Sequence, residues 1–282
     1  MAKQADIVFT LDTTASMGWV IEGMKQVILD LQSAFLENRI QVRVGLVEFR
    51  DSVHAMEVGS YPMDGADRRC FAMQHFQFED QYFTSNANAF ETAVNSLNAL
   101  GGGPHPESSF DAICAAVEES NWLPSSHRVI IHITDAPPNI PDLKCKSADE
   151  LVNIINENGG IDQLYIVCHS SDQVHYEPLA KSYQHMKEKD FIALEFKKIE
   201  NDNTEDLIMQ LRQITKTSSD NIEAAEVLLG RDASSADSTK PPSENPFDVD
   251  DEIVEEVIVL DHTPDVDGMV VEEDDEFMFD DD

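Results

Sequence analysis

The sequence predicts an α/β fold in which a doubly wound, mostly parallel sheet is flanked by helices and followed by an acidic tail. Apolar runs of strand length alternate along the chain with longer segments of helical periodicity, which is typical of parallel sheets. Two of the apolar runs end abruptly at an acid, Asp12 and Asp135. Beyond residue 216 the composition changes to acids, serines and prolines. These observations divide the chain into a folded domain, 1–216, and a low-complexity tail, 217–282.

The first half of the domain opens with a buried strand, expected at 7–11, that runs directly into a helix. From Met17 to Phe35 the apolar residues recur with the i, i+3, i+4, i+7 spacing of a helix that packs one face on a sheet. Ser16 is placed to cap this helix. A second strand is expected at 42–49, and a helix at 84–100. Between them, residues 71–78 indicate a short, half-exposed edge strand that runs antiparallel.

The second half of the domain repeats the alternation of strand and helix. A near-continuous apolar strand begins at Arg128 and ends at Asp135. Further strands are expected at 163–168 and 191–196, and helices at 109–119, 148–158, 176–187 and 204–214. A short helix over 220–229, ended by Gly230, is expected at the start of the tail.

Charge is spread unevenly along the 282 residues, whose formal net charge is −36. Residues 1–216 hold 32 Asp and Glu against 17 Lys and Arg, a net of −15, and residues 217–282 hold 23 against 2, a net of −21. So acidic a chain repels nucleic acid and anionic lipid, and we expect neither as a partner.

The tail has too few large apolar side chains to offset the entropy of ordering, so we expect it to be disordered. Ile253–Leu260 is the exception, because it is β-branched and flanked by acids. Val257–Leu260 could add as a strand to the sheet edge of a protein partner, with its acids meeting a basic surface. It looks like a SUMO-interacting motif. A purely solvating extension and a tail that folds back on its own domain remain alternatives.

The cysteines and the N-terminus indicate an intracellular protein. Cys70, Cys114, Cys145 and Cys168 form no CxxC pair; Cys114 and Cys168 fall in apolar runs, whereas Cys145 lies between two lysines and is expected to be exposed. The first residues lack the apolar core of a signal peptide, and no apolar run reaches the ~18 residues that a membrane span needs. We therefore expect a cytoplasmic protein, with the nucleus as an alternative.

The chemistry of the strand ends predicts a cation site. Two hydroxyl residues follow Asp12 at alternate positions, so Asp12, Thr14 and Ser16 share one strand-to-helix turn, and Asp135 ends another strand of the same sheet. Open α/β sheets bind ligands at the carboxyl ends of their strands. Carboxylate and hydroxyl oxygens suit Mg²⁺, Mn²⁺ or Ca²⁺ rather than zinc or copper. Helix capping would explain each residue singly, but not acids after two separate buried strands.

Three segments resemble, in order, the motifs of von Willebrand factor A domains, whose metal-ion-dependent adhesion site (MIDAS) opens on the first strand. The turn at residues 12–16 is similar to their DxTxS signature, and Gly101–Glu107 to the GGGDxPE loop of many intracellular members. The segment from Arg128 to Pro138 is similar to their third metal loop, and Arg50-Asp51 to the pair that follows their second strand. The resemblance covers roughly residues 5–216.

The sequence departs from the family pattern at two positions. Pro104 stands where the second loop has an aspartate, so His105, Glu107 or Ser108 would have to replace that ligand, directly or through water. Asn139 stands where the third loop has a histidine.

The resemblance implies a Rossmann-like fold and a non-catalytic interaction module, in which a partner carboxylate completes the coordination of Mg²⁺. The alternative is a hydrolase or phosphotransferase that uses the same cation. Haloacid dehalogenase phosphatases need a second acid where this chain has Thr14, and the sequence contains no P-loop, GxGxxG, GxSxG or HExxH motif. His132 lies in a strand and is interpreted as a core histidine. We predict no catalytic residue.

Overall fold

The computed structural model describes residues 3–37, 39–51, 53, 73–102, 106–186, 194–199 and 203–235. Within these ranges, side chains are described except at 28–34, 36–37, 184–186 and 223–235. The predictions on Pro104, His105 and Ile253–Leu260 therefore lie outside the described residues. No described helix is long and apolar enough to cross a membrane.

The described strands form one sheet in the order β3-β2-β1-β4-β5-β6, which confirms the predicted fold class. Neighbouring strands are parallel, except that β2 and β3 pair antiparallel at the edge, as expected. Because β1 lies between β2 and β4, the sheet winds outward from β1 in both directions. The strands are β1 (Lys3–Asp12), β2 (Ile40–Phe49), β3 (Met73–His75), β4 (His127–Ile133), β5 (Gln163–His169) and β6 (Leu194–Ile199).

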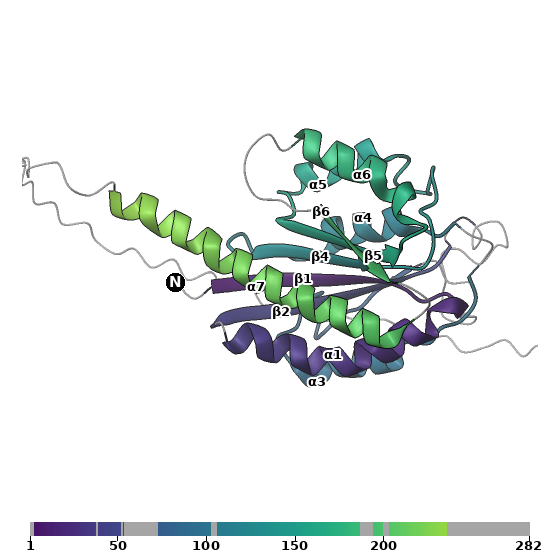
Figure 1. The fold of residues 1–282 in the computed structure, drawn as a ribbon, viewed down its shortest axis with the longest axis horizontal. Helices are drawn as coiled ribbons and strands as arrows, with labels where there is room; N and C mark the ends of the chain where they lie inside the picture. Colours follow the sequence, from purple (N-terminus) through teal and green to yellow (C-terminus); the bar gives the residue numbers. More distant parts are fainter. Residues whose placement is uncertain are drawn as a thin grey trace, which may run out of the picture. The chain divides into compact units, whose positions relative to one another are not determined.

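Helices cover both faces of the sheet (Figure 1). The 3-10 turn η1 (Ala15–Met17) leads from β1 into α1 (Gly18–Glu37), which shares one face with α3 (Ala87–Ser96) and α7 (Thr204–Ser235). The opposite face carries α4 (Ser109–Glu119), α5 (Ala148–Glu157) and α6 (Gln173–Met186). The resulting three layers are the arrangement that alternating strands and helices predict.

The alternation of side chains along β1 supplies both halves of the core. Ile7, Phe9 and Leu11 belong to the apolar cluster beneath α1 and α7, whereas Val8 belongs to the cluster beneath α4 and α5. Thr10 lies directly opposite His132 of β4, and β1 ends at the fully buried Asp12. β1, which is apolar on both faces, thus places the carboxylate of Asp12 at the carboxyl edge of the sheet.

Several predicted boundaries shift for local reasons. Ser16 lies inside η1 and is exposed, so the prediction that it caps the first helix is wrong. The helix predicted from Thr84 begins at Ala87 instead, because Thr84 exchanges backbone hydrogen bonds with Val44 and the side chain of Asn86 accepts the first free N–H groups. α6 begins three residues earlier than expected and continues through Pro178.

The last strand and the last helix differ more from the prediction. β6 lies at Leu194–Ile199 rather than at 191–196. α7 is one continuous helix to Ser235, so Gly230 does not end it. The predicted domain limit at residue 216 falls inside this helix, and its buried positions continue through Ser218, Ser219 and Ile222.

Candidate metal centre

The turn after β1 holds Asp12 and Thr14 in a fixed arrangement. Asp12 Oδ1 accepts hydrogen bonds from the backbone N–H of Thr14 at 2.9 Å and from its hydroxyl at 2.8 Å. The Thr14 hydroxyl also lies 3.3 Å from Ser16 Oγ. Asp12 is fully buried and Thr14 nearly so, whereas Ser16 is exposed. Three of the four residues that the sequence predicts as metal ligands therefore form one chain of oxygen atoms leading from the interior to the surface.

The turn after β4 completes the environment of Asp12. The hydroxyl of Thr134 donates to Asp12 Oδ2 at 2.8 Å and accepts from the N–H of Ala136 at 3.1 Å. Asp135 comes next in the chain and is close enough to raise the pKa of Asp12 by charge repulsion. One of its buried carboxylate oxygens, Oδ1, has no hydrogen-bond partner among the described residues. Sequence reasoning found Asp135 but did not assign Thr134 its role in fixing Asp12.

Glu107 lies close to the turn after β1. A Cβ atom built on Gly102 would lie 2.8 Å from Thr14 Cγ2 and 3.4 Å from Glu107 Oε1, so these three residues converge. Glu107 is 1% exposed, and its Oε2 has no partner among the described residues. Ser108 instead donates a hydrogen bond to Asp142; burial raises the pKa of Asp142 to about 7, and this hydrogen bond acts in the opposite direction. Of the alternatives that Pro104 raised, Glu107 is therefore the described residue that points at the site.

A second ring of contacts holds the loops together. Arg50 donates from Nε to the carbonyl of Thr13 and from Nη2 to that of Asn98, both at 3.1 Å, so it ties the turn after β1 to the segment after α3. Asn139 donates from Nδ2 to Asp51 Oδ1 at 3.0 Å. Arg50, Asp51 and Asn139 are all buried. The asparagine that departs from the family pattern thus still connects the third loop to the end of β2.

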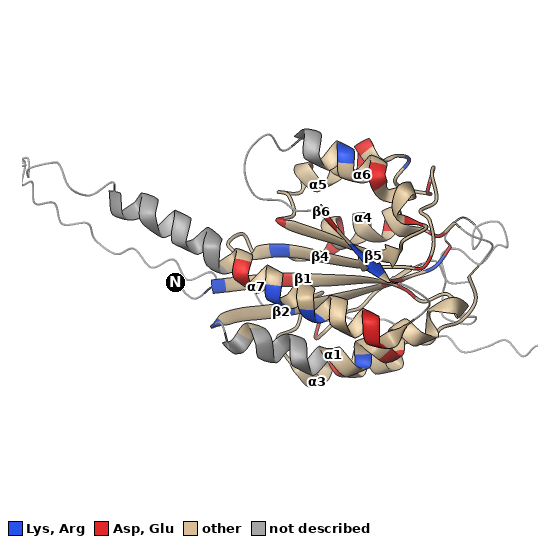
Figure 2. Cartoon of the chain, in the orientation of Figure 1, with Lys and Arg blue, Asp and Glu red and all other residues tan. Residues whose placement is uncertain are grey.

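The site concentrates negative charge in a buried place. Burial is the main reason that the pKa of Asp12 rises from 3.8 to about 6, with Asp135 adding repulsion. Burial also raises the pKa of Glu107 from 4.5 to about 9, and Asp12, Asp51 and Asp135 raise it further, while Arg50 acts in the opposite direction. Acidic residues are visible in the loops at the carboxyl ends of the strands (Figure 2). The mutual repulsion of these acids is of the kind that a bound cation relieves.

The residues present fit a hard divalent ion. The side chains of Asp12, Thr14, Ser16, Glu107 and Asp135 offer only oxygen, and two of the carboxylates carry oxygens without partners among the described residues. In the part of the chain that the structure describes, no three His, Cys, Asp or Glu side chains are grouped so as to hold a metal by themselves. A cation here therefore depends on the hydroxyls of Thr14 and Ser16 and on water as well as on the acids.

The sequence analysis made predictions about two residues outside the site, Cys145 and His132. Cys145 is fully buried, so the prediction of an exposed thiol is wrong; its N–H donates to Asp111 Oδ1 at 2.7 Å, which draws the loop against α4. His132 is fully buried, as expected, and its Nδ1 lies 2.7 Å from the hydroxyl of Thr10. Its ring stacks on Phe49, and its Nε2 has no partner among the described residues.

Comparison with known proteins relates this chain to a protein family. Residues 73–163 match the family model described as von Willebrand factor A domain. This match, together with the six-stranded sheet, supports a von Willebrand factor A domain in this chain. The matched residues include Glu107 and the turn after β4, and the turn after β1 lies against both.

One curated relative of the A domain is Alpha-protein kinase vwkA of Dictyostelium discoideum, 30% identical over 134 residues. The matched segment is 47% of this chain and 18% of the kinase, so the chain spans less than a fifth of that protein's length. Two solved structures are also similar. Proximal thread matrix protein 1 from the mussel byssus, with a zinc-occupied MIDAS motif, is 15% identical at a TM-score of 0.48 and covers 77% of this chain and 46% of its own. The pilus adhesin SpaC from Lactobacillus rhamnosus GG is 17% identical at a TM-score of 0.47 and covers 78% and 30%.

Proposed function

We propose that this A domain is a non-catalytic interaction module that binds a carboxylate of a partner protein through a divalent cation. Asp12, Thr14 and Ser16 would hold the cation, with Asp135 and Glu107 supporting it directly or through water. Mg²⁺ is the favoured ion and Mn²⁺ or Ca²⁺ the substitutes, because every available ligand is an oxygen. The cation would act as a Lewis acid with a position open to a carboxylate from outside.

The observation that carries this proposal is the pair of unpartnered buried carboxylate oxygens, Glu107 Oε2 and Asp135 Oδ1, beside a fully buried Asp12. Buried acids with free oxygens destabilise a protein unless a cation or a donor satisfies them. Ser16 is exposed and would connect the site to the surface. A ligand can therefore approach from the Ser16 side, while the acids lie behind it.

The hydrolase alternative would need a base or nucleophile that substrate can reach. His132 lies near the end of the strand that leads to Asp135, and it is fully buried between Phe49 and Tyr176. Its burial lowers its pKa to about 3, so it stays neutral at ordinary pH. No specific observation at the site favours catalysis over binding.

The tail supplies a second element of the proposal. We propose that residues beyond 235 form an acidic docking arm, in which Val257–Leu260 adds to the sheet edge or basic surface of a protein partner. The described cysteines are free and buried, which suits the reduced cytoplasm that we propose as the location.

Cation binding is tested by titrating Mg²⁺ into the full chain in a calorimeter. Asp12→Asn preserves the size of the side chain but removes the charge, so it should lose the binding heat while its circular dichroism stays that of the parent. Asp149→Asn on α5 is the matched control, because Asp149 is exposed and its carboxylate accepts a hydrogen bond from Ser182 of α6. Equal Mg²⁺ affinity for Asp12→Asn and the parent would refute the assignment.

Partner binding is tested by capture from a cell extract with and without EDTA, using intact and tail-deleted protein. A partner that needs the cation should be lost both with EDTA and with Asp12→Asn. A partner that is retained under both conditions would be bound elsewhere on the domain or by the tail.

A further inference from the structure

Two thiols lie side by side where α4 meets the loop that follows β4. Cys114 belongs to α4 and Cys145 to the loop. Both are fully buried, both are free, and both belong to the same apolar cluster. Their side chains share a hydrogen bond, and the Cys145 thiol also donates to the carbonyl of Ser147 at 3.4 Å. Neither thiol belongs to the cation site.

One face of α4 holds Cys145 against Cys114. Asp111, Cys114 and Glu118 follow one another at i, i+3 and i+7, which places them on the same face of the helix. The Asp111 carboxylate accepts hydrogen bonds from the N–H of Lys144 at 2.9 Å and from that of Cys145 at 2.7 Å. Glu118 forms an ion pair with the ammonium group of Lys144. The loop is thus fixed to α4 on both sides of Cys114, so the two sulfur atoms stay in contact.

Further hydrogen bonds keep this part of the loop closed. The Asp142 carboxylate accepts from the N–H of Asp111 at 3.2 Å, and the N–H of Asp142 donates to the carbonyl of Cys145 at 3.1 Å. The ammonium group of Lys146 donates to the carbonyl of Asp142 at 2.6 Å. α4 and the loop therefore bind each other in both directions, and the thiols cannot separate without breaking charge-assisted hydrogen bonds.

The surroundings of the two thiols exclude other common uses of cysteine. Among the described residues, no third His, Cys, Asp or Glu joins the pair to hold a metal. The hydrogen bond to Cys145 raises the pKa of Cys114, and burial raises it further. Cys114 therefore keeps its proton and is a poor nucleophile towards an external substrate. The chemistry that remains is a reaction between the two sulfur atoms.

We propose that Cys114 and Cys145 form a disulfide in the folded domain when it is exposed to hydrogen peroxide. The Cys145 sulfur attacks the peroxide: an S–O bond forms, the O–O bond breaks, and the products are a sulfenic acid and one water. The Cys114 sulfur then attacks the sulfur of Cys145: an S–S bond forms, the S–O bond breaks, and the hydroxyl leaves with the Cys114 proton as a second water. One peroxide is reduced to two waters, and two thiols are oxidised to one disulfide.

The local structure favours this order of attack. Cys145 lies in a loop, whereas Cys114 lies in a helix that is packed in the core. A loop can open locally for a molecule as small as peroxide. When the loop closes again, the sulfenic acid returns to the Cys114 thiol, which is held at a far higher effective concentration than a thiol in solution. In the reducing cytoplasm such a disulfide is transient, so the pair would respond to oxidation reversibly.

The disulfide would fix the loop that carries Asp135. The ring that it closes runs from residue 114 to residue 145 and includes β4 and Asp135. Closing a ring of this length restricts the unfolded chain, so the oxidised domain should melt about 5–10 °C above the reduced domain. This inference does not rest on the cation site, because a domain without a bound cation should form the same bond.

The test treats the full, reduced chain with hydrogen peroxide in EDTA and maps its peptides by mass spectrometry. The thiols that remain are alkylated with iodoacetamide in urea, and the digest is analysed without reduction. The expected product is a pair of peptides joined through Cys114 and Cys145. It should be two hydrogens lighter than the two reduced peptides together, and dithiothreitol should release them.

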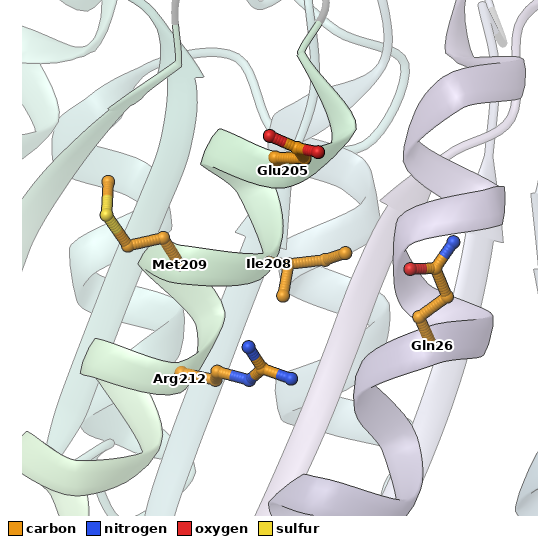
Figure 3. A pocket seen from close by; sticks show the side chains of 5 residues that line it. All are labelled: Gln26, Glu205, Ile208, Met209 and Arg212. Carbon is orange, nitrogen blue, oxygen red and sulfur yellow. The ribbon is translucent and has the colours of Figure 1, made fainter.

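Two methionines report on the oxidation itself. Met209 is 57% exposed and lies at the open groove between α1 and α7 (Figure 3). It should become its sulfoxide, which shows that peroxide reached the protein. Met17 is fully buried and should stay unoxidised, which shows that the domain remained folded. None of the other residues that line the groove carries a sulfur atom; they are Gln26, Glu205, Ile208 and Arg212.

Matched variants identify the sulfur atoms that react. Cys114→Ser and Cys145→Ser should each remove the linked peptides and the rise in Tm. Cys168→Ser is the control and should keep both, because Cys168 is a buried, free thiol of the same apolar cluster. Cys70→Ser should also keep both; it removes a thiol that lies outside the described residues.

Three results would overturn the proposal. Alkylation of both Cys114 and Cys145 in urea, after Met209 is fully oxidised, would show that the pair does not react. A disulfide to Cys70, or one between two chains, would show that other sulfur atoms react first. Linked peptides that appear only together with Met17 sulfoxide would show that the bond forms in the unfolded chain rather than in the folded domain.

Discussion

Replacing Glu107 by glutamine tests whether this acid serves to bind a cation or stabilises the fold as an anion. Glu107 is buried, one of its oxygens has no partner among the described residues, and its pKa is raised from 4.5 to about 9, chiefly by burial. In the cation-free protein at pH 7 it therefore carries a proton that the unfolded chain would have released. Glutamine has the shape of the protonated acid and needs no proton.

The size of the effect follows from proton linkage. Keeping a proton at pH 7 on a group with an unfolded pKa of 4.5 costs about 3 kcal/mol. Because the folded pKa is raised, stability is highest below pH 4.5 and falls as the pH rises to about 9. Glu107→Gln should therefore stabilise the cation-free protein at pH 7 by about 2–3 kcal/mol, which raises Tm by about 4–10 °C in a domain of this size.

Thermal unfolding followed by circular dichroism at pH 5, 7 and 8.5 provides the assay. In EDTA the variant should melt above the parent, and the difference should grow with pH. In excess Mg²⁺ the difference in Tm between variant and parent should become smaller or change sign. A ligand at 100 times its Kd adds about 2.7 kcal/mol to the free energy of unfolding, and the variant binds Mg²⁺ more weakly than the parent does. A lower Tm for the variant in EDTA would refute the reasoning, because it would mean that Glu107 stabilises the fold as an anion.

Asp111→Asn is the matched control for Glu107→Gln. Asp111 is equally buried and lies four residues further along the chain, but its carboxylate accepts hydrogen bonds from the backbone N–H groups of Lys144 and Cys145. The variant should melt below the parent by about the same amount in EDTA and in Mg²⁺, since the loss of hydrogen bonds to a charged group costs about 1.5–3 kcal/mol whatever the cation does.

Three further predictions concern the neighbourhood of the site and the core. Gly102→Ala should cost about 1–2 kcal/mol and weaken Mg²⁺ binding by titration, because Gly102 has φ +86° and its new Cβ would meet Thr14, whereas Gly18→Ala should be nearly neutral, with its nearest neighbour at 3.7 Å. His132 stays neutral in the folded protein, whereas in the unfolded chain it gains a proton below pH 6.5, so its contribution to stability falls as the pH drops towards 3. The difference in the free energy of unfolding between the parent and His132→Gln, measured in urea, should therefore shrink by about 2 kcal/mol from pH 7 to pH 5. The buried thiols of Cys114, Cys145 and Cys168 should resist iodoacetamide at pH 8 in the native protein and react with it in urea, as measured by mass spectrometry. Burial also raises the pKa of Cys168 to about 12.

The sequence by itself determined the elements and the type of sheet. The apolar runs of β1 and β4 are buried on both faces, and such runs are typical of a parallel sheet covered by helices. Periodicity also located α1 and α4, since an apolar face repeats every turn wherever a helix packs on a sheet. Asp12 and Asp135 were predictable as members of one site because each ends a strand, and the carboxyl ends of parallel strands meet at one edge.

Only the tertiary structure decided which other side chains complete the site. Glu107 lies between α3 and α4, whereas Thr134 and Asn139 lie in the loop after β4, and no local pattern fixes how these two segments approach Asp12 and Asp51. The same is true of Cys145, which stands between two lysines in a loop and is nevertheless buried, because Asp111 accepts hydrogen bonds from its N–H and from that of the preceding Lys144. Periodicity reports which face of an element is apolar. Contacts between loops depend instead on the order of strands in the sheet, which brings residues more than 100 positions apart within hydrogen-bonding distance.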